Sequence, residues 1–166
     1  MKLTEITLRV ILNGEIMNPN FVAFKEKFRI NELTIVQTKH WTWSVRPVHS
    51  TIGAGIISLN RYCEKYSSIS NSESEDFANV IRIIENTVKR CYMYEKINYL
   101  MLMMVDAHLH YHVIPRYSKP IKFYKIEWQD KSWPSLPSLI GDIPSDQVLI
   151  AIRDYLKKHL VYKRSS

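Results

Sequence analysis

Three histidines occupy alternate positions in the segment 108–114, which reads His-Leu-His-Tyr-His-Val-Ile. Successive side chains of an extended strand point to opposite faces of a sheet. The segment therefore predicts a strand with His108, His110 and His112 in one row and with apolar side chains on the opposite face, where they can pack on a core. Because imidazoles titrate near neutral pH, this strand is also the strongest candidate for a chemical role.

The chain as a whole is suited to one packed domain. It has 166 residues, of which 46% are hydrophobic and 23% charged, so we expect a packed core and no wholesale disorder. We expect a single domain over 1–166, with 1–30 as an N-terminal extension and 118–166 as a C-terminal segment that folds back on the domain.

The sequence also predicts where the protein is located and what kind of ligand its charge favours. No apolar run reaches the roughly 18 residues of a membrane span, and the first residues lack the apolar centre of a signal peptide. Cys63 and Cys91 do not form a metal-type pair, so reduced thiols are expected. These features predict a cytoplasmic protein with no membrane partner. The formal net charge of +7 favours anionic ligands such as phosphate, nucleotide or nucleic acid.

The predicted sheet surrounds the histidine strand. Stretches rich in β-forming residues at 33–37 and 41–46 predict a hairpin, and 56–59 predicts a third strand. The apolar run 97–105 predicts a buried strand that pairs antiparallel with the histidine strand. Pro115 has no backbone N–H, so the histidine strand should be an edge strand or should end there. The connection between 105 and 108 is expected to be tight.

Helices are predicted before, between and after these strands in the sequence. Apolar residues at helical spacing over 77–91 predict a long amphipathic helix, with Ser72 and Glu75 as its capping box. Residues 21–28 predict a short helix, and 6–12 fit a strand or a helix. The proline-rich segment 118–145 is irregular, and Ser145 can cap a final helix. Together these elements predict an α+β fold with an antiparallel sheet of about five strands, one long helix and a C-terminal helix.

The chemistry of the histidine row has three interpretations. A structural role is disfavoured, because each buried imidazole without a partner costs about 1–3 kcal/mol. A metal site is disfavoured, because the ends of the row lie about 13 Å apart on a straight strand and the rings converge poorly on one ion. The third is nucleophilic catalysis at phosphorus, in which one imidazole attacks while its neighbours bind phosphate oxygens or supply a proton. Spacing alone does not say which histidine attacks.

The triad and its flanks resemble the signature of the histidine-triad (HIT) superfamily. That signature is His-x-His-x-His followed by two apolar residues, and Val-Ile-Pro-Arg-Tyr at 113–117 is similar to the continuation in bacterial members. Asp-Lys-Ser-Trp-Pro at 130–134 is similar to a stretch that follows the triad in some bacterial HIT-like hydrolases. The predicted order of elements matches as well, and the resemblance covers roughly residues 30–135.

The resemblance implies an α+β fold that is often dimeric, so a homodimer is an expected state. It implies attack on the α-phosphorus of a nucleotide, a covalent nucleotidyl-histidine, and transfer to water or another acceptor. In the family the middle histidine attacks, which maps to His110. His108 and His112 flank it, position it and bind phosphate or leaving-group oxygens. Neither a metal nor another cofactor is implied.

The chain also departs from the family pattern. Residues 51–62 are similar to the stretch Thr-x-Gly-His-x-Leu-Val-Ile-Pro-Lys-x-His, but the first histidine falls on Ala54 and the last on Tyr62. A supporting histidine is therefore missing. Many members also have a carboxylate that binds ribose hydroxyls, and here Ser44 or Arg46 stands near that position. The base and the leaving group are left undefined.

Three further residues are candidates to bind substrate. Arg116 shares the parity of the histidines and is a candidate phosphate ligand, with an ion pair or solvent as the alternative. Trp133 is a candidate to stack on a base or cover the site, with core packing as the alternative. Asn98 is the nearest amide upstream of the triad, where members often have a polar residue directed at phosphate, with a structural role as the alternative.

The sequence is therefore interpreted as a HIT-like nucleotide hydrolase or nucleotidyl transferase that acts through His110 on a nucleotide or another small phosphate compound. The alternative is a nucleotide- or nucleic-acid-binding protein with little turnover, which the missing histidine and the positive charge favour. Nucleic acid is the less favoured partner and stays open. A metal-dependent enzyme is a third hypothesis, which predicts loss of activity with a chelator.

Overall fold

A five-stranded antiparallel sheet forms the centre of the fold. The structure, a computed structural model, describes residues 10–12 and 15–162. The strand order is β3-β4-β5-β7-β6, which confirms the expected α+β class and the sheet of about five strands. The bounds of the strands are Thr34–Gln37 (β3), Trp41–Val45 (β4), Gly55–Leu59 (β5), Lys96–Leu100 (β6) and His110–Arg116 (β7).

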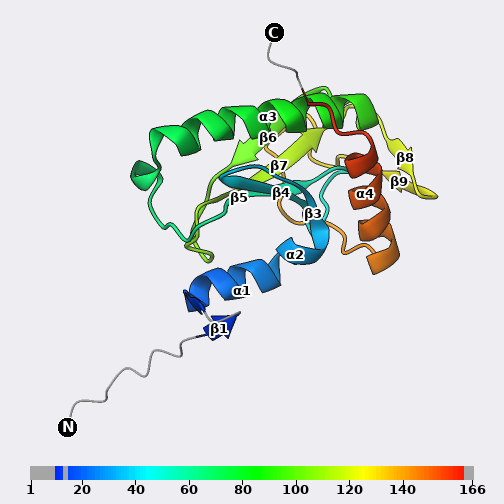
Figure 1. Ribbon diagram of the computed structural model, residues 1–166. Coiled ribbons are helices and arrows are strands. Elements are labelled where there is room, and N and C mark those ends of the chain that lie inside the picture. Colours follow the sequence, from blue (N-terminus) through cyan, green and yellow to red (C-terminus); the bar gives the residue numbers. More distant parts are fainter. Residues whose placement is uncertain (1–9, 13–14, 163–166) are drawn as a thin grey trace.

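Helices cover both faces of this sheet (Figure 1). The long helix α3 lies along one face, and α1 with the short helix α2 lies against the other. The C-terminal helix α4 contacts β3, β4 and α3. Their bounds are Pro19–Lys27 (α1), Ile30–Leu33 (α2), Asn71–Tyr92 (α3) and Asp146–Lys158 (α4), with a 3-10 turn, η1, at Tyr66–Ser68. The division into one domain with two flanking segments stays a prediction.

Two small hairpins lie outside the main sheet. One pairs β1 (Val10–Leu12) with β2 (Glu15–Met17), and the other pairs β8 (Ile121–Phe123) with β9 (Ile126–Trp128). Of the segment 6–12, the described part is therefore strand, and the rest of it lies outside the described residues, as do residues 13–14. No helix of the described residues is long and apolar enough to cross a membrane.

The predicted capping box of α3 is displaced by two residues. Ser70 is the N-cap: its Oγ accepts from the Glu73 N–H at 3.2 Å, while the Glu73 carboxylate accepts from the Ser70 N–H at 2.7 Å. Two Ser-x-x-Glu patterns overlap in this stretch, and a tertiary contact selects the first. Arg61 donates to Glu73 at 2.6 Å, so Glu73 is held at this position whereas Glu75 is exposed.

The strand predicted at 97–105 is shorter than expected. β6 ends at Leu100, which pairs with His112, and residues 101–109 form an irregular connection. Met104 and Val105 are each 87% exposed rather than buried. The prediction failed because an apolar run indicates burial only where a partner is present, and β6 is the edge of the sheet. The predicted tight connection before the histidine strand is wrong for the same reason.

Pro115 does not end the histidine strand. β7 lies between β5 and β6 and continues through Pro115 to Arg116, so the expectation of an edge strand is wrong. The ladder with β5 has its last pair at Gly55 and Val113. Beyond it, the Pro115 carbonyl accepts from Thr51 Oγ1 at 2.6 Å. The missing N–H therefore faces the side where β5 has ended, and the ladder with β6 needs no donor from it.

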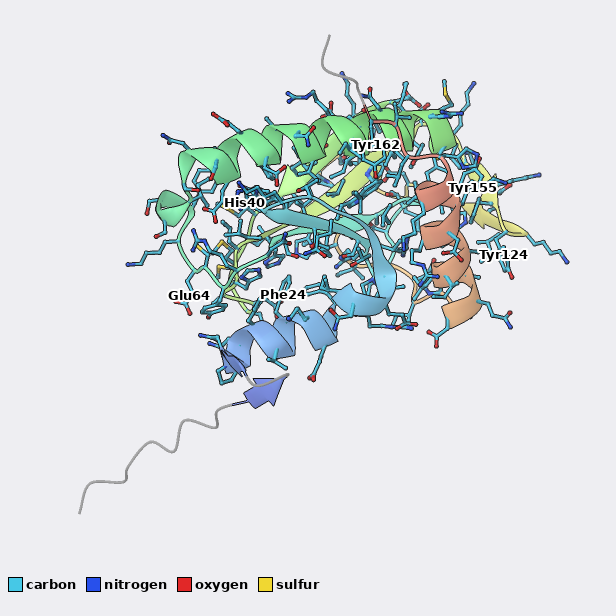
Figure 2. All side chains as sticks on the ribbon, in the orientation of Figure 1. Phe24, His40, Glu64, Tyr124, Tyr155 and Tyr162 are labelled. Atoms are coloured by element: carbon cyan, nitrogen blue, oxygen red, sulfur yellow. The ribbon has the colours of Figure 1, made fainter. Side chains whose placement is uncertain are left out.

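The two faces of the sheet differ in chemistry. The face under α3 carries the main core, with Trp41, Trp43, Ile57, Leu109 and Val113 all fully buried. The opposite face carries the histidines, and a smaller cluster covers it. That cluster consists of Phe24, Phe28, Ile30 and Ile56. Figure 2 shows Phe24 between α1 and the sheet.

Candidate active site

The strand register places the histidine row on the face beneath α1. His112 pairs with Ile56 of β5 and Leu100 of β6, and His110 pairs with Ser58 of β5. His108 lies two residues before β7. The ring centroids of His110 and His112 are 5.0 Å apart, and all three histidines are buried. The alternation in the sequence therefore produces the expected row.

Aromatic side chains of α1 pack directly on this row. The Phe24 ring lies 4.7 Å from His108 and 5.0 Å from His110, between ring centroids. Phe28, which follows α1, lies 5.6 Å from His110 and 5.9 Å from His112. These contacts remove water from the imidazoles.

Backbone hydrogen bonds fix the tautomers of two histidines. His110 Nδ1 lies 2.7 Å from the carbonyl oxygen of His108. A carbonyl can only accept, so Nδ1 carries the proton and Nε2 of the neutral ring keeps a free lone pair. In His108 the roles are reversed. Its Nε2 donates to the Leu59 carbonyl at 3.0 Å, and its Nδ1 accepts from the Cys63 N–H at 3.4 Å.

Burial keeps the whole row uncharged. Loss of solvation lowers the pKa of His108 and of His112 to about 4, and it lowers the pKa of His110 as well. The neighbouring Arg46 lowers the pKa of His112 further. All three rings are therefore neutral near pH 7, which is the state that a nucleophilic imidazole requires.

His110 and His112 line a cavity of about 330 Å³, which we call the histidine pocket. Most of its wall is apolar. Three charged residues also reach it: Lys27, Arg46 and Asp106. Lys27 pairs with Asp106 at 2.7 Å, and this pair joins α1 to the connection 101–109. The remaining lining residues are Phe28, Pro47, Val48, Leu102, Met103, Met104, Val105 and Leu139.

The other three predicted site residues lie together in a different place. Arg116 donates to Asp130 from Nε at 2.6 Å and to Asn98 from Nη1 at 3.1 Å. Its Cζ lies 5.8 Å from the Trp133 ring centroid. Arg116, Asn98 and Trp133 line a second cavity that does not include the histidines. The structure thus brings Arg116, Asn98 and Trp133 to one another but not to the histidine pocket, and their binding role stays a prediction.

The departures from the family stretch have definite places in the fold. Tyr62 stacks on His108, with ring centroids 5.8 Å apart and planes 16° apart. Ala54 is buried, and its carbonyl accepts from the Arg46 N–H at 3.0 Å. His49 is buried against Trp128, with ring centroids 5.4 Å apart, and does not line the histidine pocket.

Sequence reasoning missed several residues of the pocket. Lys27 and Phe28 come from the end of α1, about 80 positions before the triad, and Asp106 lies in the segment that the sequence predicts as a tight connection. No local pattern could have placed them there, because the contact depends on how α1 packs on the sheet. Within the described residues, no group of three or more His, Cys, Asp and Glu side chains has a metal-binding arrangement.

Comparison with known proteins identifies the fold. No family model and no curated protein matches the chain. Among solved structures, a histidine-triad protein from Sinorhizobium meliloti is similar with a TM-score of 0.64 and 15% identity, over 81% of this chain and 94% of that one. A hypothetical histidine triad nucleotide-binding protein from Sulfolobus tokodaii has a TM-score of 0.59 and 12% identity, over 76% and 82%.

A third similar structure is the diadenosine triphosphate hydrolase of Plasmodium falciparum in complex with cyclomarin A. Its TM-score is 0.57 at 12% identity, over 95% of this chain and 85% of that one. The chain therefore has the fold of the histidine-triad proteins, which confirms at the level of the fold the resemblance that its motif indicated. On that fold it places a row of neutral histidines beside a cavity.

Proposed function

We propose that the chain is a HIT-like hydrolase or nucleotidyl transferase that acts at the α-phosphate of a nucleotide through His110. One observation carries the proposal. The hydrogen bond from His110 Nδ1 to the His108 carbonyl, at 2.7 Å, leaves an unprotonated Nε2 with a free lone pair on a ring that lines the histidine pocket. The solved structures that share the fold, one of them a diadenosine triphosphate hydrolase, support a nucleotide as the substrate class.

The reaction follows from this geometry in two displacements. His110 Nε2 attacks phosphorus, a P–N bond forms, and the bond from phosphorus to the leaving group breaks with its electrons. The ring becomes positively charged, and the His108 carbonyl stabilises it through the Nδ1 hydrogen. Water or another acceptor then attacks the same phosphorus and loses a proton, the P–N bond breaks, and His110 returns to its neutral state.

The flanking histidines have different roles in this proposal. His108 uses both ring nitrogens on backbone groups, so it is a positioning residue. His112 Nδ1 has no partner among the described residues, and the ring lines the pocket. A bound phosphate brings negative charge that raises the pKa of His112 above its value of about 4 in the free protein. His112 can then hold the proton that the leaving group takes.

Covalent trapping tests the proposal. The protein is incubated with α-³²P-labelled nucleotides and dinucleoside polyphosphates, quenched with denaturant and examined for acid-labile label. We expect label on the wild type, and a loss of turnover of about 10³-fold or more in His110→Ala, because a covalent nucleophile is removed. His159→Gln, at the C-terminal end of α4 and outside the histidine pocket, is the matched control and keeps both the label and the turnover. Unchanged turnover in His110→Ala would contradict the mechanism.

A second candidate is a nucleotide-binding protein with little turnover. It is favoured by the low pKa of His112, about 4, which makes the ring a poor proton donor in the free protein. Under this candidate, wild type and His110→Ala bind nucleotide equally and neither turns it over. Steep loss of oligonucleotide binding with added salt would point instead to nucleic acid.

The proposal includes a cytoplasmic location and a homodimer. Cys63 and Cys91 are both free thiols, as a reducing compartment requires. Exposed apolar side chains follow the edge strand β6, among them Leu102, Met104 and Val105, and such a patch supports self-association. Sedimentation or light scattering at several concentrations tests the dimer.

A further inference from the structure

Arg46 is a buried cation without a carboxylate. The residue is 8% exposed, and its Nη1 donates to the Val48 carbonyl at 2.7 Å. Its Nε has no partner among the described residues. Burial lowers the pKa of Arg46, which reflects the cost of holding the charge there. Among the ion pairs of the described part of the chain, carboxylates accept from Arg29, Arg61, Arg116 and Arg153 but not from Arg46.

An unpaired buried cation is costly, and proteins retain such groups mainly at functional sites. The place of Arg46 fits that explanation, because it lines the histidine pocket with His110 and His112. The other cation of the pocket, Lys27, is neutralised by Asp106. Since the imidazoles are neutral, Arg46 supplies the uncompensated positive charge of the pocket.

The sheet register separates Arg46 from the proposed nucleophile. The Arg46 N–H donates to the Ala54 carbonyl, so Arg46 extends the ladder of β4 and β5 by one step beyond Val45 and Gly55. His110 lies two strands away and four residues further along the sheet. At about 3.3 Å per residue and about 4.8 Å between strands, the two Cα atoms are roughly 16 Å apart. The two long side chains shorten this gap, and His112, which pairs with Ile56, lies between the two residues in the register, so Arg46 lies on the far side of His112 from His110 along the sheet.

We propose that Arg46 binds a second phosphate of the substrate, other than the one that His110 attacks. The inference rests on the proposed function, and it defines the substrate class as a nucleotide that carries a further phosphate, either on its sugar or in its phosphate chain. Arginine has donors only, in a planar fork that matches phosphate oxygens. It cannot accept a hydrogen bond from a sugar hydroxyl, so a free 2′,3′-diol gains little from it.

Binding measurements test the inference without turnover. Isothermal titration compares adenosine 5′-monophosphate with adenosine 5′-diphosphate and with the 2′,5′- and 3′,5′-bisphosphates, on His110→Ala and on wild type. We expect at least one of the three ligands with two phosphates to bind about tenfold or more tightly than the monophosphate, and the ligand that does so shows whether the second phosphate is on the sugar or in the chain. Arg46→Gln should abolish this preference while its monophosphate affinity changes less than threefold. Arg153→Gln removes a surface arginine and keeps the preference, so it controls for overall charge.

Three outcomes overturn the inference. The first is equal binding of the monophosphate and of all ligands with two phosphates by the wild type. The second is equal weakening of all ligands in Arg46→Gln, which would place the reacting phosphate on Arg46. The third is no binding of any of these ligands. None of these depends on covalent labelling, so they are separate from a failure of the His110 mechanism. Thermal melts of the free proteins add a second readout. We expect Arg46→Gln to melt at or above the wild-type temperature, because the unpaired charge is gone, whereas a structural arginine would lower it.

Discussion

Two buried arginines show how differently this fold treats charge. Arg116 is 3% exposed and is neutralised by Asp130 at 2.6 Å, with Asn98, Ser132 and Ser135 accepting from its remaining donors. Arg46 is 8% exposed and has one backbone acceptor. The first arrangement is complete without a ligand, and the second is not. Partnering, rather than burial, therefore separates the cluster around Arg116 from the histidine pocket.

The comparison predicts opposite effects of removing one charge in each region. Asp130→Asn leaves Arg116 buried without its carboxylate, and we expect the free energy of unfolding to fall by about 3–5 kcal/mol. Arg46→Gln should leave it unchanged or raise it. Urea denaturation at pH 7 measures both.

A double variant sharpens that test. If the loss in Asp130→Asn comes from the uncompensated charge, Asp130→Asn with Arg116→Met should recover part of the stability, since the stranded guanidinium is gone. Similar destabilisation by Arg46→Gln and Asp130→Asn would break the distinction between the two regions.

Acid should lower the free energy of unfolding through the buried histidines, which are neutral in the folded protein. Burial lowers the pKa of His49 to about 3 and of His108 and His112 to about 4, from an ordinary value near 6.5. Between these values the unfolded chain binds more protons than the folded one, so stability is full above about pH 6.5 and falls as the pH drops toward 4. Each such histidine contributes up to about 1.4 kcal/mol per pH unit.

Urea midpoints from pH 8 to pH 4 measure this slope. His49→Phe should reduce the slope by about one proton, because His49 is buried outside the pocket and has no partner for either ring nitrogen among the described residues. A slope that is the same in wild type and in His49→Phe would mean that His49 does not stay neutral in the folded protein.

The sequence predicted the elements whose pattern is local. Alternation in 108–114 gave the histidine face, and helical spacing gave α3. It failed where a distant partner decides, as when Arg61 selects Glu73 for the capping box. Parity placed Arg116 near the histidines but could not show that Asp130, fourteen residues later, accepts from it.

In the candidate site, too, the residues that share a local pattern were predictable and those brought together by distant contacts were not. The alternation in the sequence supplied the triad, because its three members are alternate residues of one short segment. The pocket wall could not be predicted, since it combines the end of α1, the turn after β4 and the connection 101–109. The sequence places Ser44 or Arg46 near the position of the family's ribose carboxylate, and the lack of a partner for Arg46 is visible only in three dimensions.

The smallest predicted effect concerns the ion pair at the pocket. Lys27 and Asp106 are 2.7 Å apart, with side chains 50% and 19% exposed, so solvent screens the pair and Lys27→Met should cost less than about 1 kcal/mol of stability. Yet the pair neutralises Lys27 beside Arg46. Removing Asp106 instead, as Asp106→Asn, frees a second cation in the pocket, and we expect tighter binding of a bisphosphate in that variant than in wild type. Titrations of both variants at two salt concentrations check this. If Asp106→Asn binds no better than Lys27→Met, the charge of the pocket is not set by this pair, and Arg46 alone distinguishes it from the Arg116 cluster.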